Sequence, residues 1–303
     1  MDTLPQFVKK FISQSDPSVN EVEFRFHELY GPKHSISHDL YEHVLSKVLK
    51  SSFWKKIAMT NDVVVIGKSL SKSNPDVRKI THGKSVIYQT KTRKNVQSYN
   101  DFNVRASEAL EASVTLSDDD WSSKYIPTLQ RSRKRASFTD DSGMWRLDIT
   151  EIVNAGESNN TTYELEPEYS DKSRVVSLKN ITAVFENILQ MIQMSNYVIS
   201  NSFGRQLIGD YSKLLNINPR YPKFVGPLPF TLTKDTFTSG KLSCGYSVTD
   251  KADGDRKLLF VGKSGLTLIL SRPKDNNMIY NHIGYESSLE NSIFDGELIG
   301  DTL

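Results

Sequence analysis

Apolar residues recur along this chain at two different spacings, which divide it into predicted helices and strands. Helical spacing predicts an opening helix at residues 3–13, a second at 38–50 and a longer one at 181–199. Short runs rich in β-branched residues predict strands at 21–26, 63–66, 77–81, 86–93, 103–107, 132–139, 145–152 and 162–168. Many antiparallel strands with few helices are typical of a barrel or a sandwich, so we expect a mainly β fold with flanking helices.

The composition changes after the third helix. Residues 216–230 contain four prolines, which is typical of a connector between domains. Beyond it, further strands are predicted at 245–249, 257–261, 266–270 and 293–298. We therefore expect a first domain at 1–215, a connector at 216–230, and the N-terminal part of a second, mostly β domain at 231–303.

Length and composition limit the classes of protein that fit. A chain of 303 residues accommodates about two domains. The net charge of +2 gives no general reason to expect a polyanionic partner. The single cysteine, Cys244, excludes a disulfide framework within the chain and fits a reducing compartment. Residues 1–11 have no long apolar core, so we expect no secretory signal. Since no apolar run approaches about 18 residues, we expect no membrane partner.

Two predicted strands place glutamates on one face. In 21–26, Glu21, Glu23 and Arg25 alternate with three apolar residues, and 163–168 repeats the pattern. The acidic positions of the later strand are Glu164, Glu166 and Glu168. An edge strand with a solvated face would show the same alternation. Like charges along one face repel, however, and a hard divalent cation ligated by carboxylate oxygens would neutralise them.

Basic residues in the intervening strands also share faces. The same-face sets are Lys91 with Arg93; Arg133 with Arg135 and Ser137; Arg146 with Asp148; and Asn103 with Arg105, Ser107 and Glu111. A barrel with these charged faces inside and the apolar faces outside would be the reverse of an ordinary core. Buried charges are costly unless they are paired or bind a ligand. Carboxylates for a metal and arginines for phosphates are what a polyphosphate site requires.

Several of these strings resemble one family. Glu21-Val-Glu-Phe-Arg25 and Tyr163-Glu-Leu-Glu-Pro-Glu168 resemble the paired glutamate motifs of the triphosphate tunnel metalloenzymes. They are most similar to the RNA triphosphatase domain of capping enzymes from large DNA viruses. Arg135-Ala-Ser-Phe-Thr139 and Trp145-Arg-Leu-Asp-Ile-Thr150 look like two intervening strands of that domain. The resemblance spans roughly residues 15–210 and implies an eight-stranded antiparallel tunnel barrel.

The resemblance also implies roles for individual residues. Metal ligands for Mg²⁺ or Mn²⁺ would be Glu21, Glu23, Glu164 and Glu166, with Glu168 a further candidate. The triphosphate of a 5′-triphosphate RNA would be held by Lys91, Arg133, Arg135 and Arg146, with Arg78 and Arg105 as weaker matches. Glu111 and Asp148 would support these groups. Pro167 departs from the family pattern, and a proline within a strand implies an edge or a bulge.

A lysine motif begins the second predicted domain. Tyr246-Ser-Val-Thr-Asp-Lys-Ala-Asp-Gly-Asp-Arg256 could be a charged turn, but it resembles the nucleophile motif of the covalent nucleotidyltransferases. Asn291-Ser-Ile-Phe-Asp-Gly-Glu-Leu-Ile299 resembles their Asp-Gly-Glu strand. The resemblance implies an ATP-grasp-like fold in which Lys251 attacks the α-phosphate of GTP. Arg256, Glu297 and the weaker candidate Arg272 would contact the nucleotide.

The order of the two predicted domains favours mRNA capping. A triphosphatase followed by a guanylyltransferase matches the first two steps of cap formation. This implies a longer protein, a possible cap methyltransferase domain or subunit, and action in the host cytoplasm, in a viral factory or in the virion. Three alternatives remain open: a polynucleotide ligase that transfers AMP, a non-enzymatic RNA-binding module, and a tunnel that acts on free nucleotides or polyphosphate.

Overall fold

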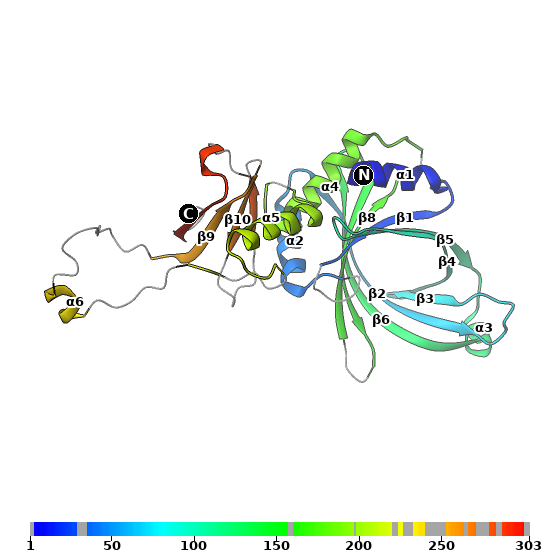
Figure 1. The fold of residues 1–303 in the computed structure, drawn as a ribbon. Helices are drawn as coiled ribbons and strands as arrows, with labels where there is room; N and C mark the ends of the chain where they lie inside the picture. Colours follow the sequence, from blue (N-terminus) through cyan, green and yellow to red (C-terminus); the bar gives the residue numbers. More distant parts are fainter. Residues whose placement is uncertain are drawn as a thin grey trace. The chain divides into compact units, whose positions relative to one another are not determined.

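The computed structural model describes residues 3–28, 35–156, 160–171, 173–196, 198–219, 224–226, 233–239, 253–263, 266–270, 279–282 and 287–299. The chain divides into two compact units, Met1–Met194 and Ser195–Leu303 (Figure 1). The division precedes the helix α5 (Asn201–Leu214), whereas the sequence placed the domain boundary at residue 215.

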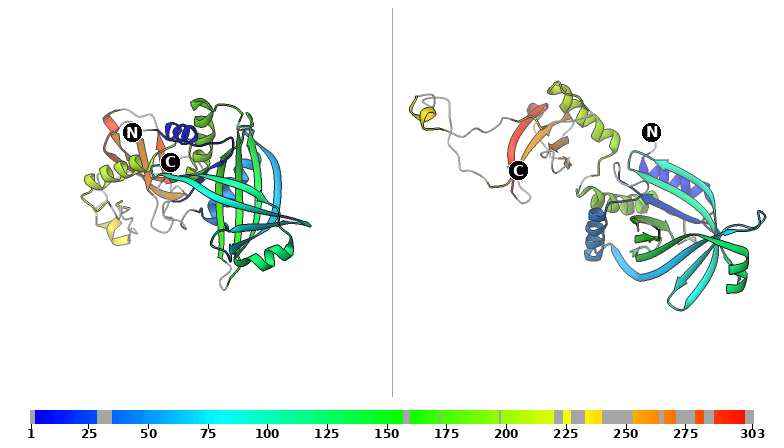
Figure 2. Two further views of the ribbon diagram at one scale, coloured as in Figure 1. Left: turned by 90° about the vertical axis from the view of Figure 1, so that its right-hand side faces the viewer. Right: turned by 90° about the horizontal axis from the view of Figure 1, so that it is seen from below.

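The first unit is a closed, eight-stranded antiparallel barrel with the strand order β1-β5-β4-β3-β2-β6-β7-β8 (Figure 2). Its strands are β1 (Glu21–Phe26), β2 (Trp54–Ser69), β3 (Val77–His82), β4 (Ser85–Tyr99), β5 (Val104–Val114), β6 (Tyr125–Asp140), β7 (Trp145–Asn154) and β8 (Asn160–Tyr169). Its helices are α1 (Leu4–Gln14), α2 (His38–Lys50), α3 (Asp118–Lys124) and α4 (Leu178–Gln193). The predicted eight-stranded antiparallel barrel is confirmed.

The main hydrophobic core of this unit lies on the outer face of the barrel. Phe24 of β1 contacts three aromatic rings: Phe185 of α4 at 5.4 Å, Phe11 of α1 at 5.8 Å and Trp145 of β7 at 5.9 Å between centroids. All four side chains are buried. In Figure 1, α1 and α4 lie together beside β1 and β8. Because apolar burial occurs on the outer face, the inner face of these strands is free to carry charge.

A second apolar cluster fixes α3 to the outer wall. Trp121 of α3 stacks on Tyr125 at 5.3 Å and packs with the buried Val77 and Tyr88. Position 67 of β2 must be glycine, since a Cβ there would lie 2.3 Å from the Trp121 ring. The sequence did not predict α3, which is a short helix that starts with a Ser117 capping box.

The expected position of Pro167 at an edge or a bulge is wrong. β8 lies between β7 and β1, and Pro167 pairs with Leu147 without a register shift between β7 and β8. The ladder to β1 pairs Glu23 with Glu168 and Phe26 with Leu165, and skips the proline between them. Pro167 is therefore accommodated at the β1–β8 seam by an interrupted ladder, because proline has no N–H to donate.

The second unit contains an antiparallel sheet of order β11-β10-β9-β12. Its elements are α5, α6 (Lys234–Thr238), β9 (Asp255–Val261), β10 (Leu266–Leu270), β11 (Ile279–His282), the 3₁₀ helix η2 (Ser287–Leu289) and β12 (Ser292–Leu298). Leu207 and Tyr211 of α5 pack with Leu258 and Phe260 of β9 in a buried cluster. The strand predicted at 245–249 lies outside the described residues. Among the described helices, none is long and apolar enough to cross a membrane.

Candidate active site in the barrel

The barrel encloses a cavity of about 710 Å³ whose lining is dominated by charged side chains. Its carboxylates are Glu21, Glu23, Asp62, Glu111, Asp148, Glu164, Glu166 and Glu168. Its cationic side chains are Arg25, Arg78, Lys91, Arg93, Arg131, Arg133, Arg135 and Arg146. The structure thus brings together the residues predicted as metal ligands and supporting groups in the first domain, and all the predicted phosphate ligands except one. The weaker match Arg105 is not part of this lining.

Lys91 lies among three carboxylates at one end of β1. Its Nζ forms ion pairs with Glu21, with Glu23 at 3.7 Å and with Glu111 at 3.1 Å. Burial alone would favour the neutral amine, but the three carboxylates outweigh burial and raise the pKa of Lys91. The lysine therefore stays charged and occupies a position that attracts cations.

Arg25 holds the acidic pair of the neighbouring strand β8. Its Nη1 lies 2.8 Å from Oε1 of Glu164, and its Nε donates to Oε1 of Glu166 at 2.6 Å. The sequence placed Arg25 on the same face as Glu21 and Glu23 but assigned it no role. The signal was present in the alternation of residues 21–26, which points every second side chain into the barrel.

The buried carboxylates differ in their affinity for protons. Burial raises the pKa of Glu166 to about 8, with a further contribution from the Glu23 carboxylate, and raises that of Glu168 to about 7 against the opposing effect of Arg146. Burial and the neighbouring Glu23 also raise the pKa of Glu21. For Glu23, burial is outweighed by Lys91 and Arg25, which lower its pKa. These carboxylates therefore repel one another and would gain from a bound cation.

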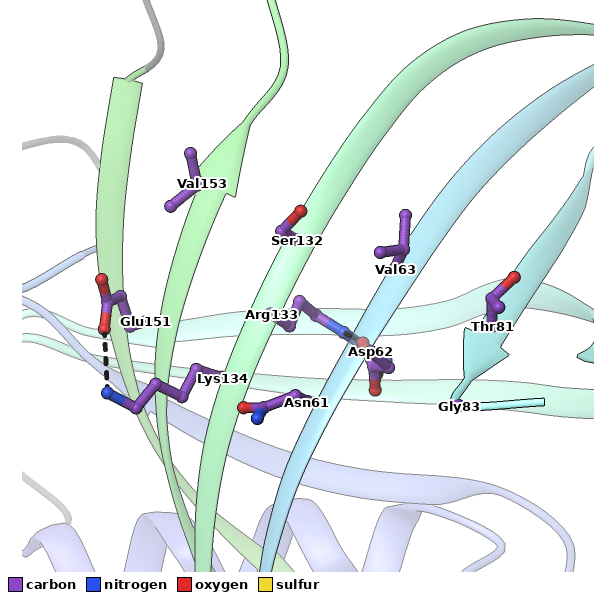
Figure 3. Close-up of a pocket in the computed structure, with 10 residues that line it drawn as sticks. All are labelled: Asn61, Asp62, Val63, Thr81, Gly83, Ser132, Arg133, Lys134, Glu151 and Val153. Atoms are coloured by element: carbon purple, nitrogen blue, oxygen red, sulfur yellow. Dashed lines mark hydrogen bonds and ion pairs between the residues drawn. The ribbon is translucent and has the colours of Figure 1, made fainter. Parts of the chain in front are cut away.

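The opposite wall presents arginines to the cavity. Arg133 donates to both oxygens of Asp62, from Nε at 2.7 Å and from Nη2 at 2.9 Å. Figure 3 shows Arg133 extending toward Asp62, whereas its neighbour Lys134 extends toward Glu151 of β7. The sequence did not single out Asp62, because residues 54–62 lack a regular alternation of apolar and polar residues.

Two further arginines share Asp148. Nη1 of Arg135 lies 3.1 Å from Oδ2 of Asp148, and Nε of Arg146 donates to Oδ1 at 3.2 Å. Ser137 donates to the same carboxylate at 2.7 Å, so Asp148 fixes both guanidinium groups. The Nε atoms of Arg135 and Arg131 are buried without a hydrogen-bond partner among the described residues. Unpaired buried donors of this kind match the oxygens of a phosphate chain.

The carboxylates suit a divalent metal in their chemistry. Mg²⁺ and Mn²⁺ prefer oxygen ligands, and the glutamates of β1 and β8 provide them from adjacent strands. In the described part of the chain, no three His, Cys, Asp or Glu side chains are already arranged around one ion position. Lys91 and Arg25 hold the carboxylates instead. A metal would take over contacts that these two cations now make.

The residues predicted for nucleotidyl transfer lie in the second unit. β9 and β12 pair Arg256 with Glu297, and the Gly254 N–H donates to Oε2 of Glu297 at 2.9 Å. Nε of Arg256 donates to Oδ1 of Asp295 at 2.8 Å. The two motif strands are thus direct neighbours. Lys251 and Arg272 lie outside the described residues.

A comparison of sequences gives a viral relative. No family model matches the chain. The "Probable mRNA-capping enzyme" of Acanthamoeba polyphaga mimivirus is 27% identical over 182 residues, which are 57% of this chain and 15% of the viral protein. The chain therefore corresponds to a small part of that relative.

Two solved structures match part of the chain at low sequence identity. The Pct1 RNA triphosphatase of S. pombe is 13% identical, with a TM-score of 0.47 over 63% of this chain and 93% of that one. The mimivirus capping enzyme triphosphatase is 11% identical, with a TM-score of 0.42 over 61% and 94%. The sequence match agrees with the resemblance that the motifs predicted: part of this chain is similar to the mimivirus mRNA-capping enzyme, and its first unit is an eight-stranded antiparallel barrel.

Proposed function

We propose that the first unit is a metal-dependent RNA 5′-triphosphatase that removes the γ-phosphate from a triphosphate-ended transcript. The observation that carries this proposal is the cavity, in which eight carboxylates face eight cationic side chains inside one barrel. An ordinary barrel core would be apolar. Desolvating so many charges is costly even where they pair with one another, which supports a charged ligand as the reason for them.

The ion pairs indicate how substrate and metal would bind. Lys91 and Arg25 now neutralise the glutamates of β1 and β8. The glutamates would hold a divalent cation, and Lys91 and Arg25 would then be free to contact phosphate oxygens. Arg135 and Arg146, oriented by Asp148, hold the phosphate chain from the other wall. A metal bound there would neutralise phosphate charge and polarise the phosphoryl group.

The test is release of labelled γ-phosphate from triphosphate-ended RNA, with Mg²⁺ or Mn²⁺ and with a chelator. We expect release that depends on the metal. Parallel reactions with free nucleotide and inorganic tripolyphosphate identify the alternative substrates of such a tunnel. RNA binding without release of phosphate from any substrate would instead indicate a non-enzymatic RNA-binding module.

For the second unit, we propose the N-terminal part of a guanylyltransferase. The adjacent strands β9 and β12, which pair Arg256 with Glu297, support it. In the proposed step, Nζ of Lys251 forms a bond to the α-phosphorus of GTP while the α–β anhydride bond breaks and pyrophosphate leaves. GMP would then pass to the diphosphate end that the first unit produces. A cap methyltransferase, and action in the host cytoplasm, a viral factory or the virion, belong to the same proposal.

This second activity has a separate test. The full-length protein is incubated with α-labelled GTP or α-labelled ATP and analysed by denaturing electrophoresis. We expect a labelled adduct with GTP that disappears in Lys251→Ala, while release of RNA γ-phosphate is unchanged. Labelling with ATP would favour the ligase alternative. An adduct that survives Lys251→Ala would remove the assignment of the nucleophile.

A further inference from the structure

One wall of the charged cavity carries a row of aliphatic side chains. Val64 of β2 is the direct cross-strand partner of Ile80 in β3, and Ile80 is the partner of Ile87 in β4. All three side chains line the cavity. Cross-strand partners on one face lie close enough for their side chains to touch, so the three form one continuous apolar strip.

The strip continues into two polar residues. Val64 pairs with Arg131 of β6 on its other side, and Arg131 pairs with Asn154 of β7. Both line the same cavity. Five adjacent strands therefore contribute a belt of three aliphatic groups, one guanidinium group and one amide. We call these five residues the aliphatic belt.

The aliphatic belt is not required to close the barrel. The cores of this unit lie on the outer face, around Phe24 and around Trp121. Ile87 keeps 57% of its surface exposed while it faces the cavity, although Val64 in the same row is only 5% exposed. An exposed isoleucine inside a polar cavity gains free energy when a ligand covers it.

The distance between the aliphatic belt and the charged site determines which part of a bound ligand the belt can contact. Along β6, Arg131 lies four residues from Arg135, which corresponds to about 13 Å of strand. Arg135 pairs with Asp148 near the glutamates, and Arg133 lies between the two arginines. A ligand whose phosphates lie at Arg133 and Arg135 would therefore place its next chemical group at the aliphatic belt.

We propose that the aliphatic belt is the subsite for the nucleoside that carries the triphosphate, which in the RNA is the first nucleotide. This rests on the proposed triphosphatase function and extends it from phosphates to the base. The aliphatic strip covers one face of the base, as apolar side chains do in other nucleobase pockets. Arg131, whose Nε has no hydrogen-bond partner among the described residues, contacts the adjoining phosphate or ribose. The amide of Asn154, which donates to the Asn160 carbonyl at 3.1 Å, lies beside the base edge.

The experiment compares three substrates that share a triphosphate: triphosphate-ended RNA, ATP and inorganic tripolyphosphate. We expect Ile80→Ser/Ile87→Ser to lower kcat/KM for RNA and ATP by about 10-fold, equivalent to about 1.4 kcal/mol. Hydrolysis of tripolyphosphate, which has no nucleoside, should stay within about 2-fold, because its phosphate contacts are unchanged. The single variant Ile87→Ser should show the same selectivity with less risk to folding, since Ile87 is exposed.

The matched control is Val86→Ser, which changes the neighbouring residue on the other face of β4 and should leave all three substrates unaffected. Equal losses on all three substrates, or no loss on RNA and ATP, would overturn the nucleoside subsite while the triphosphatase function stands. A wild-type protein that releases no phosphate from RNA would overturn the proposed function, and the subsite with it.

Discussion

Along β6, successive side chains alternate between the charged cavity and the outer surface of the barrel. Arg133 and Arg135 point into the cavity and pair with Asp62 and Asp148. Lys134 between them points away from it, 60% exposed, and lies 3.9 Å from Glu151 of β7. The same strand thus carries paired, partly buried charges on one face and a loose surface ion pair on the other.

β1 shows the same contrast more sharply. Glu21, Glu23 and Arg25 line the cavity, whereas the alternating Val22, Phe24 and Phe26 are buried under helices. Buried ion pairs contribute little net stability, because desolvation offsets their attraction. Buried aromatic side chains contribute several kcal/mol each. The comparison therefore indicates that the outer face stabilises the fold and that the inner face carries the proposed site, so substitutions on the two faces should have separable effects.

The largest effect on stability is expected from the outer face. Phe185 of α4 is buried and contacts the rings of Phe24, Phe26 and Trp145. Phe185→Ala should lower the free energy of unfolding by about 3–5 kcal/mol, the usual cost of an aromatic cavity. Denaturant titration measures the change in the free energy of unfolding. The fraction of the protein that stays folded should keep its turnover. A loss of turnover without a loss of stability would contradict the separate roles of the two faces.

A smaller effect, on catalysis, is expected from the inner face. Arg135→Ala should lower kcat/KM for triphosphate-ended RNA by about 10²-fold, the scale for loss of one electrostatic stabiliser. Arg146→Ala should behave similarly, because both guanidinium groups are fixed by Asp148. Steady-state kinetics measures the loss, with unfolding curves recorded alongside. Unchanged kinetics in both variants would show that this wall does not hold the phosphates.

The smallest effect on stability and kinetics is expected from substitutions of charged residues on the outer face. Lys134→Ala and Glu151→Ala remove a surface ion pair at 3.9 Å. Each should change stability by about 0.5 kcal/mol or less and leave kinetics unchanged, since exposed ion pairs contribute little. Thermal melting and the phosphate-release assay check both points. A marked kinetic loss in Lys134→Ala would mean that the substrate also contacts the outer wall.

Some features of the site follow from the sequence because a strand has a period of two. The predicted strand 21–26 and helix 38–50 match β1 and α2 residue for residue. Once those bounds are known, alternation places Glu21 and Glu23 on one face and Phe24 on the other. The same rule placed Glu164 and Glu166 together. The direction of each side chain is a local property, so a single sequence can predict it.

The partners of the charged side chains cannot be predicted from the local alternation of apolar and polar residues. Arg25 meets Glu166 across 141 residues of sequence, and Arg133 meets Asp62 across 71. These contacts depend on the register between strands that are distant in the chain, which alternation alone does not give. The short α3 was missed for a related reason, because its docking depends on the space above Gly67 for Trp121.

The most direct test of the central claim is metal-dependent phosphate release by Glu23→Ala/Glu166→Ala. These two residues lie on β1 and β8, and the Glu23 carboxylate raises the pKa of Glu166. With triphosphate-ended RNA and Mn²⁺ or Mg²⁺, the wild-type chain should release γ-phosphate, and the double variant should be slower by about 10²-fold or more. Glu151→Ala, on the outer face of β7, should match the wild type. Full activity in the double variant, or wild-type activity that survives a chelator, would contradict a metal-dependent triphosphatase in this barrel.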